Sequence, residues 1–351
     1  MNEMVNPLEN VIGPTKGRID AWTHVERTKF AFSQISDDIW PTVGYLNGKY
    51  DGFRGVIVGG GPSLDWDLIR KEADARDAGE KVRIFCPNRS HDECVARGII
   101  PDYGVLMDPA EHVAEYITPR DDVVYLIGTG VHWKVLQNML AMNARCMFWT
   151  PLYDVDAADA VAISDAFPQR PITFISGGST VGLRLINILL GWGMEPHLHG
   201  FDSAYSPKSK TLYAYDKPQT TTEFCDATIV SDKTGRQLRF TANQHMARQA
   251  MAFGGFMKRL PDTTVEGKPG ARKVTVYGDG AIPWMAWLDG GELIQHANPE
   301  KMAEKYGTAR FWDYQNDCAS DDAFAGQSYS FAPMVHLGQF ACDSIDSVYR
   351  F

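Results

Sequence analysis

Short apolar runs alternate with helix-compatible segments along the chain from Gly55 onward. The runs are GVIVG, VRIFC, YGVLM, VVYLI, RCMFW, ITFIS, PHLHGF and VTVYG, which begin at Gly55, Val82, Tyr103, Val123, Arg145, Ile172, Pro196 and Val274. Strands that alternate with helices form a parallel sheet with helices on both faces. The runs do not alternate with polar residues, which is typical of strands that are buried on both sides. We therefore expect an α/β fold with a doubly wound, mostly parallel, Rossmann-like sheet.

The same pattern divides the chain into three regions. Residues 1–54 form an N-terminal extension, in which AWTHVERTKFAFSQISDDIW has the apolar spacing of one amphipathic helix. Residues 55–289 form the Rossmann-like domain, and residues 290–351 form an irregular C-terminal extension. An insertion at 203–241 interrupts the domain and contains ATIVSDKTGRQLRF, which is typical of a hairpin. An insertion beside a binding crevice often forms a lid or a specificity element.

Charge and composition exclude several classes of partner. The chain has 351 residues and a net charge of −10, so an affinity of its whole surface for nucleic acid is not expected. The N-terminus lacks a basic region followed by an apolar core, and the apolar window VGLRLINILLGWG is too short to cross a bilayer. Six cysteines without a CxxC pair indicate a reducing compartment. We expect a cytoplasmic protein without a membrane span.

A glycine turn follows the first apolar run. It consists of Gly59, Gly60, Gly61, Pro62 and Ser63. Pro62 fixes φ, and Ser63 can cap a helix that begins at Leu64. Such a turn directs backbone N–H groups and a positive helix end at a phosphate. It matches neither GxGxxG nor the P-loop, and tight packing without a ligand is an equal alternative.

A second glycine loop, FISGGSTVGL, precedes a long apolar helix. Its small and polar residues are Ser176, Gly177, Gly178 and Ser179. Ser179 or Thr180 can cap the helix, and a tight strand-to-helix turn is the simpler interpretation. Two such loops on one sheet favour a ligand with two polar or anionic ends, such as a nucleotide.

Further polar side chains follow the strands at the edge where ligands of open α/β sheets bind. Asn88 can bond to a base or a sugar, or form an Asx-turn. Asp108 can hold Mg²⁺ or accept from a ribose hydroxyl, with a helix cap as the alternative. Asp202, close to Tyr205, can be a metal ligand, a base or a cap. His245 can act as a general acid or base, with a surface position as the alternative.

Four stretches carry a family resemblance: VIVGGGPSLD, FCPNRS, GIIPDYGVLMDP and ISGGSTVGLRLINILLGWGMEPHLHGFDSAYS. In this order they resemble the MptE-like 6-hydroxymethylpterin diphosphokinase family, from about Gly55 to Ser206 and loosely to about Asp289. The resemblance implies a nucleotide with its phosphates over the glycine loop, and transfer of diphosphate from ATP to a pterin hydroxymethyl group. Asp108 would hold Mg²⁺, which neutralises the developing charge.

The same framework is similar to that of the bacterial sialyltransferases that use CMP-sialic acid. That family has an Ala-Gly-Asn-Gly-Pro-Ser-Leu loop where this chain has its first glycine loop. It also has an Asn at the position of Asn88 and a Ser-Gly pair at the position of Ser176-Gly177. Gly60 stands where that family has Asn, and this departure weakens the CMP interpretation.

The second resemblance implies a different reaction, the transfer of a sugar from a nucleotide sugar to an acceptor hydroxyl. His245 would then be the base, and Tyr205 or Tyr213 would stabilise the leaving phosphate. A third hypothesis is a non-catalytic binding or assembly protein, whose crevice its own side chains would fill. The C-terminal extension would then dock to a partner or to a second copy in a homo-oligomer. In the two enzymatic hypotheses the partners are a small-molecule nucleotide and an acceptor.

Overall fold

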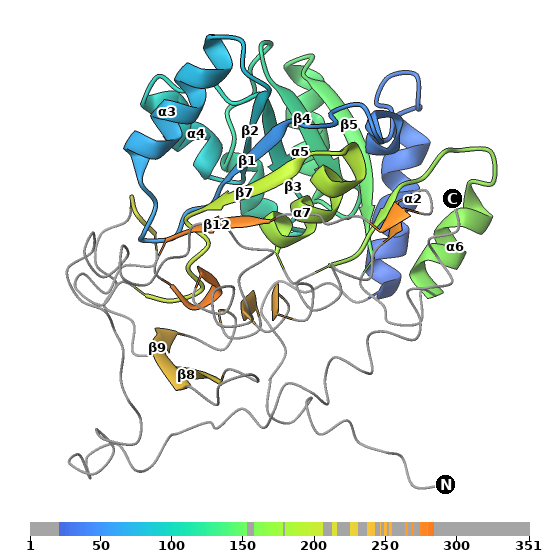
Figure 1. Cartoon of the computed structure of the whole chain (residues 1–351). Coiled ribbons are helices and arrows are strands. Elements are labelled where there is room, and N and C mark those ends of the chain that lie inside the picture. The colour runs from blue at the N-terminus through green and yellow to red at the C-terminus, as the bar shows by residue number, and fades with distance from the viewer. Residues whose placement is uncertain are drawn as a thin grey trace, which may run out of the picture.

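An eight-stranded parallel sheet organises the protein (Figure 1). The computed structural model describes residues 21–152, 158–177, 180–205, 213–215, 225–230, 237–242, 246, 249–250, 253–254, 264–265, 268–269, 274–278 and 280–283. The strand order is β12-β7-β1-β2-β3-β4-β5-β6, and each neighbouring pair is parallel. The expected doubly wound α/β sheet is therefore confirmed.

Each apolar run expected as a strand contributes to this sheet. The strands are β1 (Arg54–Val58), β2 (Val82–Pro87), β3 (Tyr103–Leu106), β4 (Val124–Gly128), β5 (Arg145–Pro151), β6 (Phe174–Ile175), β7 (Glu195–His199) and β12 (Thr275–Tyr277). Two antiparallel pairs lie outside it, β8 (Cys225–Val230) with β9 (Gln237–Ala242), and β10 (Thr264–Val265) with β11 (Lys268–Pro269). The first pair confirms the hairpin expected in the insertion, and its turn lies outside the described residues.

The helices of the described residues alternate with these strands. They are α2 (Ala21–Gln34), α3 (Trp66–Asp77), α4 (Ser90–Ala96), α5 (Trp133–Ala141), α6 (Ala158–Ala166) and α7 (Val181–Trp192), with the 3₁₀ turns η1 (Val43–Leu46) and η2 (Glu111–Glu115). The helix expected in AEHVAEYI is the short turn η2, and α6 was not expected. Residues 1–20 and 284–351, with the expected C-terminal extension, lie outside the described residues.

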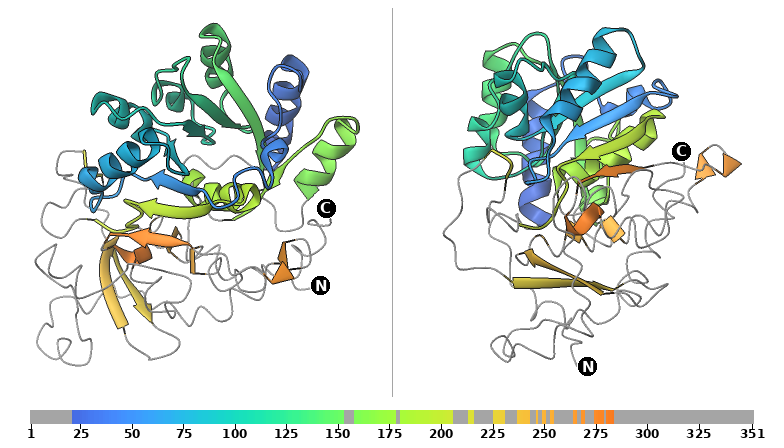
Figure 2. Two further views of the ribbon diagram at one scale, coloured as in Figure 1. Left: turned by 45° about the horizontal axis from the view of Figure 1, so that its top comes forward. Right: turned by 60° about the vertical axis from the view of Figure 1, so that its left-hand side comes forward.

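Helices cover both faces of the sheet (Figure 2). Val56 and Val58 of β1 pack with Ile69 of α3 on one face, in a cluster that also includes Cys94 of α4. Ile57 between them belongs to the core on the other face, together with Leu189 and the rest of the apolar side of α7. Side chains of a strand point alternately to its two faces, so one continuous apolar run serves both layers.

The connection from β6 to β7 creates the switch point of the sheet. The chain steps outward from β1 to β6, then returns to place β7 on the other side of β1. Ligands of open α/β sheets bind at the carboxyl ends of the strands where the order reverses. The carboxyl ends of β1 and β7 therefore mark the place to look for a site.

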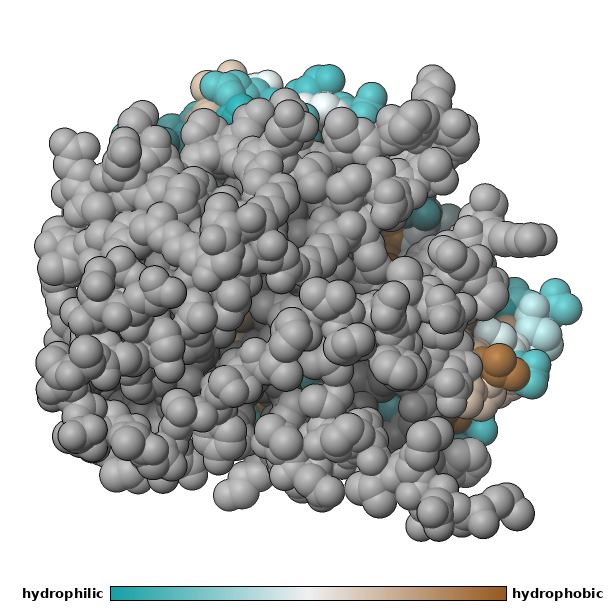
Figure 3. Space-filling view, turned by 60° about the horizontal axis from the view of Figure 1, so that its bottom comes forward, coloured by the Kyte–Doolittle hydropathy of each residue, from teal (hydrophilic) through white to brown (hydrophobic). Residues whose placement is uncertain are grey.

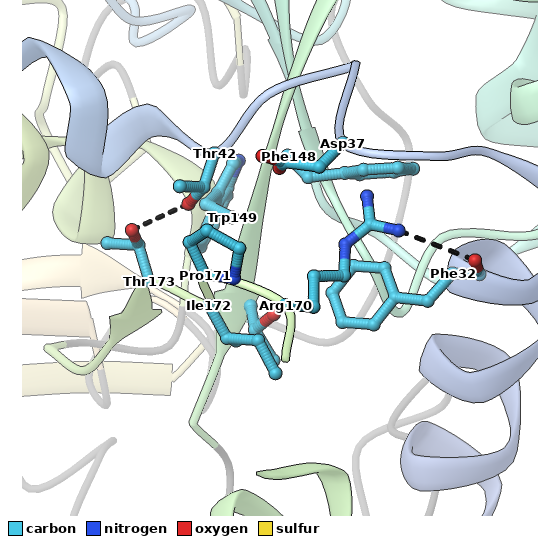
Figure 4. Close-up of a pocket in the computed structure, with 10 residues that line it drawn as sticks. Phe32, Asp37, Thr42, Phe148, Trp149, Arg170, Pro171, Ile172 and Thr173 are labelled. Carbon is cyan, nitrogen blue, oxygen red and sulfur yellow. Dashed lines mark hydrogen bonds between the residues drawn. The ribbon is translucent and has the colours of Figure 1, made fainter. Parts of the chain in front are cut away.

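The N-terminal helix α2 is part of the same body, because it packs against α5 and α6. Arg170 fixes its last turn: the guanidinium donates to the carbonyls of Phe32 and Ile35 at 3.4 and 2.7 Å and lies 4.0 Å from the ring centroid of Phe32. These groups line the pocket in Figure 4, where Thr42 and Thr173 also join their hydroxyls at 2.6 Å. The space between the side chains leaves no room for a water molecule, so this pocket is a packing seam.

The described surface is mixed in character. Figure 3 shows mainly hydrophilic side chains along its top edge and a small hydrophobic patch at its right edge. Exposed large apolar side chains of the described residues, such as Phe30, Ile39 and Trp133, come from separate elements. Within the described ranges, no helix combines the length and the hydrophobicity that crossing a membrane requires.

Candidate functional site

The glycine loop after β1 is bound to the carboxyl end of β7. The N–H groups of Gly59 and Gly61 donate to the carbonyls of His199 and Gly200 at 2.8 and 2.7 Å. Ser63 donates its N–H to the carboxylate of Asp202 at 2.7 Å, and its hydroxyl donates to the other oxygen of that carboxylate. Since Asp202 is 2% exposed, its charge is compensated inside the protein by this loop.

The glycines of this loop are needed for close approach. A Cβ atom at Gly61 would lie 2.5 Å from a carboxylate oxygen of Asp202, and one at Gly59 would lie 2.5 Å from the carbonyl oxygen of Gly200. Gly278, which follows β12 with φ +118°, lies directly against Ser63. The carboxyl ends of β1, β7 and β12 thus meet around one carboxylate.

The helix after this loop begins later than expected. We expected Ser63 to cap a helix from Leu64, but α3 begins at Trp66 and its N-cap is Asp65. The Asp65 carboxylate accepts from the N–H groups of Asp67 and Leu68 at 3.0 and 3.3 Å. Asp65 is as good a cap as Ser63, and Asp202 already holds Ser63. The prediction that the loop cradles a phosphate remains a prediction, and a carboxylate already serves this helix end.

Asn88 stands at the carboxyl end of β2, next to β1 in the sheet. Its φ of 52° lies in the left-handed region that Asn tolerates better than most residues. Its backbone N–H donates to the carbonyl of Val105 at 2.9 Å, and its carbonyl accepts from His91 at 3.2 Å. The side-chain oxygen is buried and has no hydrogen-bond partner among the described residues. The alternative of an Asx-turn is therefore not what this side chain forms here.

Arg89 and two tyrosines of the insertion lie beside the loop. Of these three, only Tyr213 was a candidate from the sequence, as a hydroxyl that would stabilise a leaving phosphate. Ala214 donates its N–H to the carbonyl of Gly60 at 2.9 Å. The rings of Tyr213 and Tyr215 are parallel, with centroids 5.4 Å apart. A Cβ atom at Gly60 would lie 2.6 Å from the Tyr215 hydroxyl and 2.7 Å from the Tyr213 ring. The guanidinium of exposed Arg89 lies 5.5 Å from the Tyr215 ring centroid.

Asp108 lies at the carboxyl end of β3 and is half-buried. One carboxylate oxygen accepts from the N–H of Ala110 at 2.9 Å, so a turn-forming role is present. Burial raises the pKa of Tyr116, and the Asp108 carboxylate adds to that rise while Arg89 opposes it. Asp108 and Arg89 follow β3 and β2, which are neighbours in the sheet, so both lie near the same phenol.

A metal ion at Asp108 would rest on few protein ligands. Among the residues that the structure describes, no three His, Cys, Asp or Glu side chains form a group that could hold a metal. Mg²⁺ usually keeps several waters and takes one or two carboxylates together with substrate phosphates. The second oxygen of Asp108 fits this kind of binding as a single protein ligand.

The second glycine loop turns tightly into α7. Thr180 caps the helix by accepting from the N–H of Leu183 at 3.2 Å, as one of the two expected caps. The carbonyl of Ser176 accepts from the side-chain amide of Asn187 at 2.7 Å, and Gly177 has φ +101°. Gly178 and Ser179 lie outside the described residues. Their predicted contact with a ligand stays a prediction.

Of two further candidates, the structure describes only Tyr205. Tyr205 is 4% exposed and belongs to the interior beyond β7. His245 lies outside the described residues. Their predicted roles as a phosphate-binding hydroxyl and a general base are not tested by the fold.

A second polar cluster lies at the carboxyl ends of β3 to β5, against α2, and the sequence pattern did not point to it. Arg27 donates to the carbonyl of Pro109 at 2.7 Å. Thr28 donates to the hydroxyl of Thr129 at 2.9 Å, which in turn donates to Thr150 at 3.3 Å. The apolar spacing around THVERT predicts an amphipathic helix. It does not predict that Arg27 and Thr28 would contact the strand ends.

His24 extends this cluster one turn earlier on α2. A Cβ atom at Gly130 would lie 2.6 Å from its Nδ1 atom. Burial lowers the pKa of His24 to about 4, and the positive charge of Arg184 contributes to the shift. Arg184 itself is buried and donates to the carbonyls of Ile175 and Leu152 at 2.6 and 2.7 Å. The outer half of the sheet edge is therefore polar, cationic and tied to the N-terminal helix.

Comparison with known proteins adds a family and a distant structural likeness. No curated protein matches the chain. The structure of MAf glycosyltransferase from Magnetospirillum magneticum AMB-1 is similar, with a TM-score of 0.44 and 15% sequence identity. That likeness covers 75% of this chain, and the chain spans only 38% of the glycosyltransferase. A likeness at this level does not define an activity.

The family comparison is more informative. The model described as "6-hydroxymethylpterin diphosphokinase MptE-like" matches residues 31–208, which is about half of the chain. The match begins inside α2, earlier than the Gly55 at which the resemblance was expected to start, and it ends just after β7. It therefore contains both glycine loops, Asn88, Asp108 and Asp202. The chain belongs to the MptE-like 6-hydroxymethylpterin diphosphokinase family.

Proposed function

We propose that this protein is a nucleotide-dependent transferase of the MptE-like type, which transfers diphosphate from ATP to the hydroxymethyl group of a pterin. The observation that carries the proposal is the side-chain oxygen of Asn88, which is buried without a hydrogen-bond partner among the described residues. Buried polar atoms are rarely left in that condition, and an exception calls for a ligand or an ordered water. Asn88 lies one strand from the switch point, where a nucleotide is expected.

The family supports the choice of reaction. Its description names a diphosphokinase. Diphosphate transfer also suits a site that offers few acidic, basic or nucleophilic side chains among the described residues. In phosphoryl transfer the protein mainly positions the reactants and stabilises negative charge. Asn88 would accept a hydrogen bond from a base or a ribose hydroxyl of the nucleotide.

The reaction balances with the two substrates alone. The hydroxymethyl oxygen attacks the β-phosphorus of ATP, and the bond from that phosphorus to the oxygen bridging to the α-phosphorus breaks. AMP leaves, the diphosphate stays on the pterin, and the hydroxyl proton passes to a base. His245, outside the described residues, remains the candidate for that base. Mg²⁺ on Asp108 would neutralise charge on the diphosphate as it is transferred.

Replacement of Asn88 tests the nucleotide site without straining the backbone. Glycine adopts positive φ readily, so Asn88→Gly removes the carboxamide and keeps the turn. The matched control is Asn143→Gly, because Asn143 has φ 49° and is exposed. We expect ATP with Mg²⁺ to raise the melting temperature of the wild type and of the control, and to lose most of this effect in Asn88→Gly.

The reaction is tested by incubating the protein with ATP, Mg²⁺ and 6-hydroxymethylpterin, and by measuring AMP and the pterin diphosphate by chromatography. Both products are expected in equal amounts. Stabilisation by CMP or a nucleotide sugar without metal would instead support the glycosyltransferase hypothesis. If no nucleotide shifts the melting temperature, the nucleotide site is refuted and the non-catalytic hypothesis takes its place.

A further inference from the structure

Ser203 has an unusual backbone conformation at the switch point of the sheet. Its φ is 46°, in the left-handed region that serine adopts rarely. The other non-glycine residues of the described chain in this region are Asn88 and Asn143, and asparagine tolerates the conformation better. Such a conformation persists only where the surrounding structure imposes it. The packing around Ser203 therefore dictates where its side chain points.

Two segments from further along the chain pack against this turn. Ala250 and Phe253 belong to the same buried core as Ala204, the residue after Ser203. From another side, the N–H of Ile282 donates to the carbonyl of Asp202 at 3.3 Å. The turn after β7 is thus fixed by contacts that come from distant parts of the chain.

The turn holds the carboxamide of Gln249. The Ser203 hydroxyl donates to the Oε1 atom of Gln249 at 2.9 Å, and both residues are half-buried. Gln249 makes no other hydrogen bond with the part of the chain that the structure describes, and its Nε2 atom keeps contact with solvent. The hydroxyl therefore fixes one end of the amide and leaves two N–H groups at the other end for a ligand.

The charge next to this amide selects the kind of ligand. Asp202 precedes Ser203, and both oxygens of its carboxylate accept from Ser63. A phosphate placed beside this carboxylate would be repelled. A neutral ring with oxygen or nitrogen acceptors along one edge would not be repelled, and it would pair with the two amide N–H groups. The 4-oxo group and N5 of a pterin are two such acceptors on one edge.

The place of the turn in the sheet leaves room for two substrates. β7 and β2 are the two neighbours of β1, so Ser203 and Asn88 follow strands on opposite sides of the glycine loop (Figure 1). Neighbouring strands are about 4.8 Å apart, so β2 and β7 are separated by about 10 Å. A nucleotide at Asn88 and an acceptor at Gln249 would therefore meet at the glycine loop between them.

We propose that Gln249 binds the ring edge of the acceptor and determines the specificity for it, and that Ser203 is a positioning residue that holds its carboxamide. This inference rests on the proposed function and names the residue that recognises the second substrate. The ligand is a neutral heteroaromatic ring with two adjacent acceptor atoms, as in 6-hydroxymethylpterin.

Calorimetry with 6-hydroxymethylpterin tests Gln249. The titration is made with Mg²⁺ and an ATP analogue in which a methylene group replaces the oxygen between the α- and β-phosphorus, so that no diphosphate is transferred. Gln249→Met should weaken pterin binding by about tenfold or more, because the ring acceptors lose their donors. The affinity for the analogue, titrated without pterin, should stay unchanged. The matched control is Gln137→Met, because Gln137 is exposed on α5.

Gln249→Glu separates the donors from the shape of the side chain. A glutamate is of similar size and still accepts from the Ser203 hydroxyl, but its carboxylate has no N–H group to donate. This variant should bind the pterin at least as weakly as Gln249→Met does. Full pterin affinity in Gln249→Glu would overturn the role of the amide donors.

A double-mutant cycle tests Ser203. Glycine adopts positive φ readily, so Ser203→Gly removes the hydroxyl and keeps the turn. It should weaken pterin binding roughly threefold, because the amide is no longer held in place. In the Gln249→Met background the same substitution should have no further effect, because Ser203 acts through Gln249. An equal loss in both backgrounds would contradict its positioning role.

The outcomes separate this inference from the proposed function. If the wild type binds the pterin and Gln249→Met binds it equally well, the inference is overturned and the proposed function stands. If Gln249→Met weakens the pterin and the ATP analogue alike, its effect is a general structural one and the inference is also overturned. If the wild type binds the analogue but not the pterin, the proposed acceptor and the inference are both overturned.

Discussion

The carboxylate of Asp202 accepts hydrogen bonds from both the backbone N–H and the hydroxyl of Ser63, although 139 residues separate the two in the chain. This contact joins the carboxyl ends of β7 and β1 at the switch point of the sheet. Asp202 is buried, so the loss of either hydrogen bond would weaken the compensation of its charge. Both residues were expected at a binding site. Their contact with each other shows that they also hold the ends of β1 and β7 together.

Substitutions of Asp202 are expected to destabilise the protein in a graded way. Asp202→Ala removes both hydrogen bonds to a charged group and should cost about 3 kcal/mol of unfolding free energy. Asp202→Asn can still accept from the Ser63 N–H and should cost about half as much, while Ser63→Ala loses only the hydroxyl contact, about 1 kcal/mol. Urea unfolding measures all three. An Asp202→Ala variant as stable as the wild type would contradict this account of the contact.

The strands were predictable because their information is local. Runs such as VRIFC and VVYLI are apolar without interruption, and no long-range partner is needed to identify a strand that both faces of a sheet bury. The start of α3 was not predictable in this way. Ser63 and Asp65 are both good caps, and the choice between them depends on Asp202, which lies far along the chain.

The candidate site was predictable only as a set of strand ends. The positions of Asn88, Asp108 and Asp202 followed from the rule that ligands bind at the carboxyl edge. Their individual environments did not follow, because burial of Asp202 and the unpartnered oxygen of Asn88 depend on packing between distant segments. The cluster of Arg27 and Thr28 was missed for the same reason, since nothing local shows where α2 docks.

Gly60→Ala is expected to destabilise the protein by overpacking. Its new methyl group would lie within 2.7 Å of atoms of Tyr213 and Tyr215, so the pair must shift, at a cost of about 1–3 kcal/mol. The test compares melting temperatures in two backgrounds. In a chain that carries Tyr213→Ala and Tyr215→Ala, the same substitution should cost little. An equal cost in both backgrounds would show that the tyrosines do not occupy that space.

Arg170 is expected to hold the end of α2. Arg170→Met removes the hydrogen bonds to the carbonyls of Phe32 and Ile35 and the stacking on Phe32, so it should cost roughly 2 kcal/mol. Hydrogen exchange followed by mass spectrometry should show that the substitution speeds the exchange of α2 amides relative to the wild type and leaves the exchange of α3 unchanged. The control is Arg145→Met, because Arg145 is exposed at the start of β5. Unchanged protection of α2 would mean that Arg170 does not anchor it.

Buried His24 is expected to make the protein less stable in mild acid. Its pKa is lowered from 6.5 to about 4 in the folded state, mainly by burial, so the unfolded chain binds the proton more readily. The contribution of the neutral ring to the free energy of unfolding is therefore complete above pH 6.5, and it is lost as the pH falls from 6.5 toward 4. A shift of this size corresponds to about 3 kcal/mol of unfolding free energy at most.

The variant His24→Gln separates this contribution from other titrating groups. Between pH 7 and pH 4 the unfolding free energy of the variant should fall less steeply than that of the wild type, because glutamine does not titrate. The difference in slope should correspond to the uptake of at most one proton on unfolding. His91 remains in the variant, and its pKa is also lowered by burial, so part of the acid sensitivity should persist. The matched control is His112→Gln, which removes an exposed histidine. Parallel pH profiles for the wild type and His24→Gln would show that His24 is not held neutral by the packing of α2 against the sheet edge.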